Sequence, residues 1–319
     1  MILAGIDIGT NTLRLLIAET GPDSFREIYS DRRITRLGQD LDRRGQFSPD
    51  AEERSLHALS DFTTSIRRHA VTHVASVGTS AFRTATNAAE YIIEVQKRIG
   101  LAIRIISGEE EARLTLLGVT HALKGLDRRR DDPLASACVV DIGGGSTEII
   151  MTRHKREPLI ISLPLGAVYL TERFIKHDPP ARDEIEFLRN TIRGVLEYQG
   201  GDLRPEPAGI FVGTAGTITT LAAMDQGLME YDADKINRYI MTKETIDAMV
   251  ADLTRKTFKE REDIPGLEQG REDIILAGAV IAQEIMKRFG FSTMIVSDWG
   301  LREGIVMDLH ARLLKSVLP

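Results

Sequence analysis

Residues 6–12 read Ile-Asp-Ile-Gly-Thr-Asn-Thr, and residues 140–146 read Val-Asp-Ile-Gly-Gly-Gly-Ser, at an offset of 134. A second matching pair, 77–80 (Val-Gly-Thr-Ser) and 212–215 (Val-Gly-Thr-Ala), lies at an offset of 135. Two matches at nearly the same offset indicate an internal repeat. The sequence therefore predicts two homologous α/β halves that face each other. The alternative is a chance likeness between turns rich in glycine and threonine.

Each half opens in the same way. An apolar run, 2–8 or 137–142, stops at a glycine-rich turn, and a second β-rich run follows over 13–18 or 148–152. This pattern predicts a strand–turn–strand hairpin with glycines at its tip. It is not the dinucleotide-binding fingerprint, because no helix begins at the turn.

Several further elements can be placed from local signals. Ser48 and Pro49 are typical of a helix start, and residues 107–110 form a capping-box pattern for a helix that reaches Gly125. Other expected helices cover residues 218–224, 273–289 and 302–314, and other expected strands cover residues 71–78, 102–106, 209–213 and 293–297. The charged segment 127–133 lacks apolar residues, so we expect the domains to be 1–128 and 129–319.

Composition excludes several classes of protein. The chain has 319 residues, 42% of them hydrophobic, a net charge of −6 and one cysteine, Cys138. No internal disulfide can form, and a zinc site of the CxxC or HExxH type is absent from the sequence. The acidic balance argues against non-specific binding to nucleic acid, and no apolar run approaches the ~20 residues of a membrane span. We expect a cytoplasmic protein with no membrane partner.

The two glycine tips carry the first candidate chemistry. A phosphate needs several N–H donors aimed at one point, and glycine allows the backbone to approach it closely. Hydroxyl groups in the tips can add donors, and Asp7 and Asp141 at the strand ends can hold a divalent cation such as Mg²⁺. The alternative is a pair of plain turns. The candidate phosphate-binding residues here are Gly9, Thr10, Asn11, Thr12, Gly143, Gly144, Gly145, Ser146 and Thr147.

Three other features could serve the same chemistry. Arg83 follows a predicted strand, where its guanidinium could bind phosphoryl oxygens in a bidentate manner, or it is a surface arginine. Glu111 ends a run of three acids at a helix start; one alternative is compensation of the helix dipole, and the other is a general base that accepts a proton from water. The third feature is a glycine-rich helix start suited to phosphate or to tight packing, with candidate residues Gly213, Thr214, Gly216 and Thr217.

At these residues the sequence resembles the Ppx/GppA family of exopolyphosphatases and guanosine pentaphosphate phosphohydrolases. The resemblance runs in family order over nearly the whole chain. The segment 107–113, Ser-Gly-Glu-Glu-Glu-Ala-Arg, narrows it from the actin-like ATPase superfamily to this family. It implies an α/β fold of two duplicated actin-like (ribonuclease H-like) domains with an interdomain cleft. It also implies that the helix at about 302–314 packs back on domain I.

The resemblance also implies roles for matching positions. Glu111 matches the glutamate that orients or deprotonates the attacking water. Asp141 and Glu148 match metal-associated acids, whereas Asp7 is a metal candidate only from its place at the end of its strand. Thr10, Asn11, Arg83 and the loop 143–147 match phosphate-binding positions.

The expected function is release of terminal orthophosphate from inorganic polyphosphate or guanosine pentaphosphate, with Mg²⁺ as cofactor and a role in the stringent response. The chain ends about 15 residues after Gly304, whereas long family members continue into a helical extension; it resembles the short form, which puts extended gripping of very long polyphosphate in doubt. Two alternatives stay open: a non-catalytic sensor of polyphosphate or guanosine polyphosphates, and an ATP-dependent kinase of the same superfamily. The sequence does not fix the oligomeric state, and a homodimer is among the arrangements left open.

Overall fold

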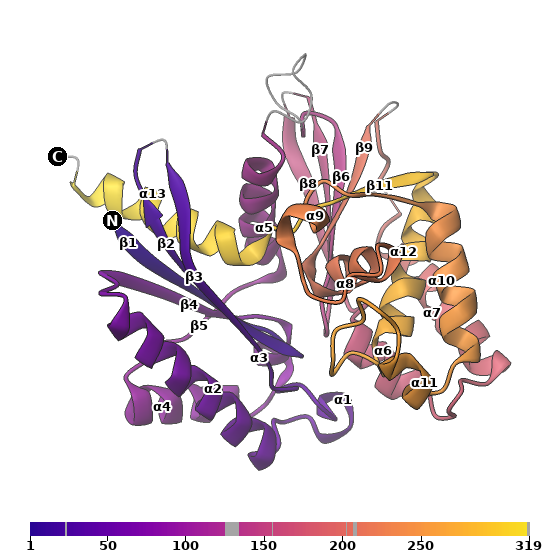
Figure 1. Cartoon of the computed structure of the whole chain (residues 1–319), viewed down its shortest axis with the longest axis horizontal. Coiled ribbons are helices and arrows are strands. Elements are labelled where there is room, and N and C mark those ends of the chain that lie inside the picture. Colours follow the sequence, from indigo (N-terminus) through magenta and orange to yellow (C-terminus); the bar gives the residue numbers. More distant parts are fainter. Residues whose placement is uncertain (23, 125–133, 155, 202, 207–208, 318–319) are drawn as a thin grey trace. The chain divides into compact units, whose positions relative to one another are not determined.

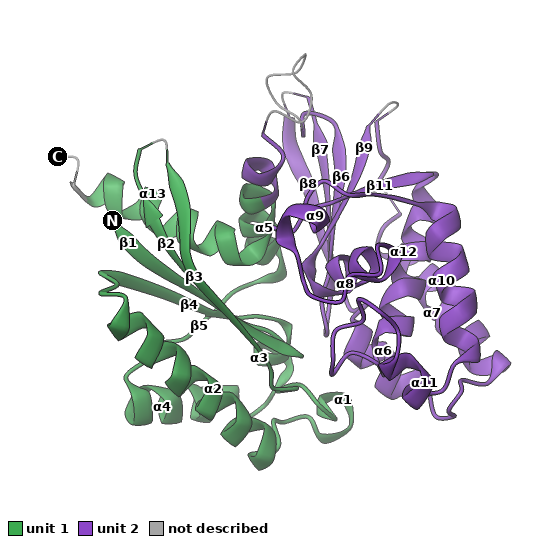
Figure 2. Ribbon diagram, in the orientation of Figure 1, with its two compact units in different colours: residues 1–118, 300–319 green, residues 119–299 purple. Residues whose placement is uncertain are grey.

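The computed structural model describes residues 1–22, 24–124, 134–154, 156–201, 203–206 and 209–317. These residues form two compact units, coloured separately in Figure 2. Unit 1 comprises residues 1–118 and 300–319, and unit 2 comprises residues 119–299. The predicted boundary at 128/129 lies outside the described residues. Over the described part of the chain, no helix combines the length and apolar character that crossing a membrane requires.

Unit 1 is built on a mixed sheet in the order β3-β2-β1-β4-β5 (Figure 1). β1 pairs antiparallel with β2, and β2 with β3, while β4 and β5 run parallel to β1. The predicted first hairpin is therefore confirmed. The strands are β1 (Ile2–Ile8), β2 (Thr12–Thr20), β3 (Phe25–Ile34), β4 (His73–Gly78) and β5 (Arg104–Ile105).

Helices cover both faces of this sheet. Alternate residues of β1 explain why: Ile6 and Ile8 are buried with α2 and α4, whereas Leu3 is buried with Val306 of α13. Gly5 shares the α13 face, and a Cβ there would lie 2.8 Å from Val306. The helices are α1 (Leu41–Arg44), α2 (Pro49–Arg68), α3 (Ser80–Thr84), α4 (Ala88–Ile99), α5 (Gly108–Ala122) and α13 (Leu301–Val317).

The starts of α2 and α5 both carry capping signals in the sequence. Ser48 Oγ accepts the N–H of Ala51 with Pro49 at the first helical position, as predicted. At the start of α5, Ser107 Oγ accepts the N–H of Glu110, but the Glu110 carboxylate binds Arg104 instead of returning to Ser107. Only half of the predicted capping box is therefore supported by these contacts. The helix ends at Ala122, short of Gly125, which is outside the described residues.

Unit 2 repeats the same topology. Its sheet has the order β8-β7-β6-β9-β11-β10. β7 pairs antiparallel with both β6 and β8, whereas β9 pairs parallel with β6 and β11 pairs parallel with β9. This order matches that of unit 1 strand for strand, with β10 added at the edge, which confirms the predicted duplication. The strands are β6 (Ala137–Ile142), β7 (Thr147–Arg153), β8 (Arg156–Leu163), β9 (Ile210–Thr214), β10 (Ile240–Thr242) and β11 (Thr293–Val296).

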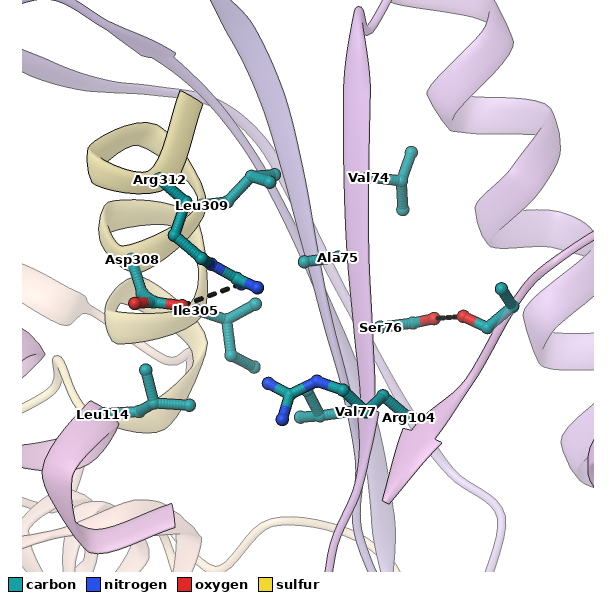
Figure 3. A pocket seen from close by; sticks show the side chains of 11 residues that line it. Val74, Ala75, Ser76, Val77, Arg104, Leu114, Ile305, Asp308, Leu309 and Arg312 are labelled. Atoms are coloured by element: carbon teal, nitrogen blue, oxygen red, sulfur yellow. Dashed lines mark hydrogen bonds and ion pairs between the residues drawn. The ribbon is translucent and has the colours of Figure 1, made fainter. Parts of the chain in front are cut away.

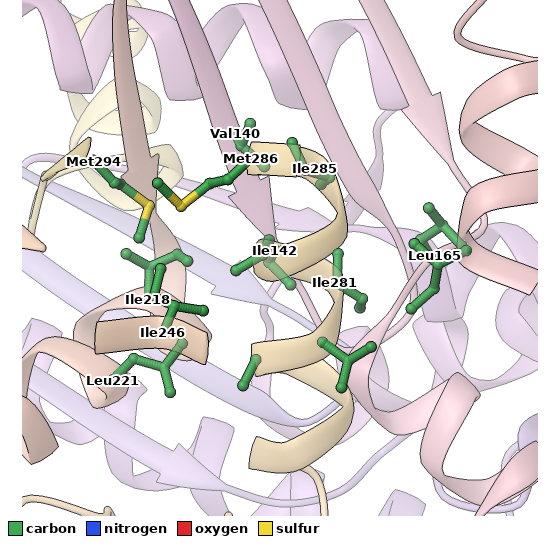
Figure 4. Close-up of a cluster of buried hydrophobic side chains, with 14 of the residues drawn as sticks. Val140, Ile142, Leu165, Ile218, Leu221, Ile246, Ile281, Ile285, Met286 and Met294 are labelled. Atoms are coloured by element: carbon green, nitrogen blue, oxygen red, sulfur yellow. The ribbon is translucent and has the colours of Figure 1, made fainter. Parts of the chain in front are cut away.

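The core of unit 2 surrounds α12 (Ile275–Phe289), which is buried from Ile275 to Met286 (Figure 4). Its apolar side chains meet those of β6 and of the neighbouring helices. Glu284 is also buried there, and Arg193 binds it through Nε at 2.7 Å, so the charge is paired. The other helices are α6 (Ala167–Phe174), α7 (Arg182–Tyr198), α8 (Ala215–Asp225), α9 (Ala233–Ile236), α10 (Lys243–Arg255) and α11 (Phe258–Glu262).

Candidate active site

The tip of the β1–β2 hairpin is a tight, buried turn. Gly9 N–H donates to the Thr12 carbonyl at 3.1 Å, and a Cβ at Gly9 would lie 2.9 Å from the same oxygen. Thr10, Asn11 and Thr12 are all buried. The segment after β3 holds the tip from outside, because Gly38 N–H donates to the Thr10 carbonyl at 2.8 Å. The candidate residues of tip 1 (9–12) are therefore fixed in one compact turn.

Asp7 lies at the carboxyl end of β1, directly opposite Arg14 of β2. Arg14 Nη1 donates to Asp7 Oδ2 at 3.2 Å, and the other carboxylate oxygen is buried with no hydrogen-bond partner among the described residues. Burial raises the pKa of Asp7 above its ordinary value, and the nearby Arg14 guanidinium opposes that rise. A buried carboxylate oxygen without a donor is suited to a cation or to cation-bound water.

Arg83 and Glu111 form an ion pair. Arg83 is in α3, directly after β4, and its Nη1 donates to Glu111 Oε2 at 2.7 Å and to the Ile106 carbonyl at 3.0 Å. Glu111 is in the first turn of α5, and its side chain is buried. The arginine therefore fixes one carboxylate oxygen in place.

The strand ends bring these groups to one edge of the sheet. Thr79 N–H donates to the Ile8 carbonyl at 3.3 Å, and Ile106 N–H donates to the Gly78 carbonyl at 3.1 Å. The carboxyl ends of β1, β4 and β5 are therefore adjacent, and tip 1, α3 and α5 leave the sheet from these neighbouring points. Ligands of α/β sheets bind outside the carboxyl ends of the strands, so this edge is the candidate site in unit 1.

The hairpin tip of unit 2 (residues 143–146, tip 2) repeats the turn of tip 1. Gly143 N–H donates to the Ser146 carbonyl at 3.0 Å, at the positions that match Gly9 and Thr12. The carbonyl of Gly144 accepts from the start of α6, and a Cβ at Gly166 would lie 2.2 Å from that oxygen. Thr147, the first residue of β7, donates its hydroxyl to the Leu165 carbonyl. That contact occupies the one proton that the Thr147 hydroxyl could give to a phosphate.

Asp141 and Glu148 lie opposite each other across the β6–β7 ladder, and both are buried. Ser162 Oγ donates to Glu148 Oε1 at 2.7 Å, which orients this carboxylate. No group of three or more His, Cys, Asp or Glu side chains converges on a point within the described ranges. Two carboxylates on neighbouring strands supply oxygen ligands of the kind that a divalent cation takes.

The β9–α8 junction carries the last set of candidates. β9 ends at Thr214 and α8 begins at Ala215, so a helix does follow the strand, but it starts earlier than the expected residue 218. Ala215 has a φ of +70°, a left-handed conformation that is uncommon for a residue with a Cβ. Thr217 is buried against Gly278 of α12, where a Cβ would lie 2.4 Å from the threonine methyl. Thr217 therefore fits the alternative of tight packing. The same is true of Gly213, where a Cβ would lie 2.4 Å from Met294 Sδ.

The structure adds two residues that the sequence analysis did not single out. Arg14 pairs with Asp7, and Ser162 binds Glu148. The signal for Arg14 was available, because counting outward from tip 1 in a regular hairpin places residue 14 opposite residue 7. Ser162 lies on β8, which the sequence analysis did not assign, so its contact could not be counted in this way.

Comparison with known proteins gives one consistent result. Residues 16–313 match the Ppx/GppA phosphatase family. Exopolyphosphatase 2 of Mycobacterium tuberculosis is 34% identical over 96% of this chain and 98% of its own length. Among solved structures, the Aquifex aeolicus member of the Ppx/GppA family is 34% identical, with a TM-score of 0.79 over 100% of this chain and 99% of its own. An exopolyphosphatase from Cytophaga hutchinsonii is 28% identical, with a TM-score of 0.86 over 98% of both chains.

Proposed function

Because the chain belongs to the Ppx/GppA phosphatase family, we propose that it releases terminal orthophosphate from inorganic polyphosphate or guanosine pentaphosphate. That it is a phosphatase follows from the family and from its exopolyphosphatase relatives. The observation that carries the finer proposal is the Arg83–Glu111 pair at the sheet edge beside tip 1. A pair of this kind offers a cation for phosphoryl oxygens and a fixed carboxylate for water in one place.

The residues of tip 1 and tip 2 would bind the phosphate chain. Both tips are glycine-containing turns, in which backbone N–H groups and the hydroxyls of Thr10, Thr12 and Ser146 are of the kind that can donate to a phosphate. Arg83 would bind phosphoryl oxygens through its guanidinium, whose planar fork of N–H donors matches phosphate geometry. We propose that the β9–α8 junction also supports phosphate binding, through Gly213, Thr214, Gly216 and Thr217.

Glu111 would act on the water. Its ionised carboxylate accepts one proton as the water oxygen bonds to the terminal phosphorus and the anhydride bond to the leaving phosphate breaks. The contact with Arg83 holds the carboxylate still during this step. Phosphoryl transfer depends mainly on placement and charge stabilisation, so no protein nucleophile is needed.

We propose Asp7, Asp141 and Glu148 as the residues that would hold Mg²⁺. The orphaned Asp7 oxygen and the opposed pair of acids on β6 and β7 support this assignment. When bound, the ion neutralises charge on the phosphoryl oxygens. The role of these three carboxylates would be to hold the ion in place.

One assay separates the proposal from its alternatives. The full chain is incubated with Mg²⁺ and, in turn, short polyphosphate, long polyphosphate and guanosine pentaphosphate, with no phosphate acceptor present. Release of orthophosphate that is lost in Glu111→Gln supports the hydrolase. A sensor releases none, and a kinase transfers the phosphoryl group to an added acceptor instead of releasing orthophosphate. The ratio of rates across the three substrates identifies the preferred one.

A further inference from the structure

Unit 1 contains a cavity of about 200 Å³ between β4 and α13 (Figure 3). Its floor is apolar, with Val77, Leu114 and Ile305 drawn from one buried cluster. The short strand β5 pairs with Val77 and Gly78 at the end of β4. Residues 74–76 of β4 come before this paired part, and they line the cavity. None of the residues proposed above for phosphate, water or metal lines it.

Charged side chains of both signs also line the cavity. Figure 3 shows the Arg104 and Arg312 guanidinium groups reaching into the space between α13 and β4. Arg104 Nη1 and Nη2 lie 2.8 and 2.7 Å from the Glu110 carboxylate oxygens, and Arg312 Nη2 lies 2.7 Å from Asp308. Asp308 itself lines the cavity, so a negative and two positive side chains face the same volume.

These ion pairs can exchange partners at low cost. The Arg104 and Arg312 side chains are 47% and 53% exposed, and pairs at such exposure contribute little to stability. Each guanidinium also has five N–H groups, more than one carboxylate uses. A ligand carboxylate can therefore join either arginine, and a ligand ammonium can take the place of a guanidinium on Asp308.

The size and the pattern of charge together select the ligand. About 200 Å³ is below the roughly 300–1,000 Å³ of sites for drug-sized molecules, so the ligand is small. A phosphate would face Asp308 and gain nothing from the apolar floor, whereas a simple hydrocarbon would leave the charged wall unused. We propose that this cavity binds a free α-amino acid with an apolar side chain. Its carboxylate binds Arg104 and Arg312, its ammonium binds Asp308, and its side chain lies on Val77, Leu114 and Ile305.

The first test uses probes that differ by one charged group. The full chain is titrated in a calorimeter with L-leucine, with 4-methylpentanoate, which lacks the ammonium, and with 3-methylbutylamine, which lacks the carboxylate. L-leucine is expected to bind, and each analogue to bind about tenfold more weakly or worse, because each loses a charge-assisted hydrogen bond. Equal binding of either analogue would overturn the zwitterion assignment, and so would no binding of L-leucine, L-valine or L-phenylalanine at millimolar concentrations.

The second test locates the site. Arg312→Gln and Asp308→Asn are each expected to weaken binding of L-leucine about tenfold or more. The matched control is Arg113→Gln, which breaks an exposed i,i+4 pair with Glu109 outside the cavity and should leave binding unchanged. Wild-type affinity in Arg312→Gln would refute the site. If a variant fails to fold, the comparison of probes on the wild-type chain still decides. None of the probes carries a phosphoryl group, so the result is independent of the proposed hydrolase activity.

Discussion

Arg83 Nη1 lies 2.7 Å from Glu111 Oε2, joining the helix after β4 to the helix after β5. The next acid back along the chain makes a parallel contact, because Glu110 binds Arg104 of β5. Two consecutive glutamates of α5 thus bind two different arginines. The candidate catalytic pair and a matched non-catalytic pair therefore exist side by side in the sequence, which makes the role of Glu111 testable with internal controls.

Glu111→Gln removes the proposed proton acceptor while keeping the shape of the side chain. We expect the turnover of polyphosphate to fall by roughly 10²–10⁴-fold, with the KM largely unchanged, because the loss affects the water and not the phosphate contacts. Glu109→Gln, at an exposed pair with Arg113, is the control and should retain activity. A folded Glu111→Gln protein with near-normal phosphate release would remove Glu111 from the mechanism.

Arg83→Lys keeps a positive charge but loses the planar fork of the guanidinium. Since Arg83 is proposed both to bind phosphate and to hold Glu111, kcat should fall and KM should rise, by roughly 10–100-fold in kcat/KM. Arg104→Lys makes the same change in the neighbouring pair. Steady-state kinetics of the two variants give the comparison: an equal loss in both would point to a general loosening of the start of α5 rather than to a specific role for Arg83.

Asp7→Asn should stabilise the protein at neutral pH while lowering its activity. Burial raises the pKa of Asp7, so the native state keeps this proton to a higher pH than the unfolded chain does. The group's contribution to stability is therefore complete below the unfolded pKa and is lost as pH rises through the raised, folded pKa. Asparagine avoids that loss, and we expect a gain of roughly 0.5–2 kcal/mol in the free energy of unfolding near pH 7.

Denaturant unfolding across pH checks the sign of the Asp7 prediction. The difference between Asp7→Asn and wild type should shrink as the solution is acidified. The exposed Asp61→Asn serves as the control and should stay within about 0.5 kcal/mol of wild type throughout. A variant less stable than wild type at pH 7 would contradict the prediction.

Two helical glycines should respond to alanine with opposite signs. A Cβ at Gly304 of α13 would lie 1.9 Å from the Leu114 carbonyl oxygen, whereas a Cβ at Gly194 of α7 meets nothing within 4 Å. We expect Gly304→Ala to lower the free energy of unfolding by about 1–3 kcal/mol through overpacking. Gly194→Ala should raise it by about 0.5–1 kcal/mol through helix propensity. Urea unfolding curves measure both, and changes of the same sign would contradict the packing account.

The sequence predicted the parts of the fold that have strong local signals. Both hairpins follow from apolar runs that stop at glycine, and their pairing is as expected. The edge strands β3 and β8 were not assigned. In β3, charged residues such as Arg26, Glu27 and Asp31 break any apolar alternation, because an edge strand on the outside of a sheet has fewer buried positions. Composition alone could not separate such a strand from a loop.

The candidate site was also predictable only in part. Within each tip the residues are contiguous in sequence, so their grouping needs no tertiary information. Arg83 and Glu111 are 28 positions apart, and their contact depends on β4 and β5 being neighbours in the sheet. The capping-box pattern at 107–110 placed the start of α5 correctly, but its second contact was wrong for a similar reason, because Arg104 on the adjacent strand binds the Glu110 carboxylate.

Unit 1 is assembled from both termini, with α13 packed on β1 through the close approach at Gly5. A ribosome makes the N-terminal segment first, and domains generally fold as they emerge. Here one apolar face of the unit 1 sheet stays uncovered until α13 has been synthesised. The continuous stretch 119–299 is complete before then. The second half of the repeat is therefore able to mature earlier than the first, the reverse of the order in which they are translated.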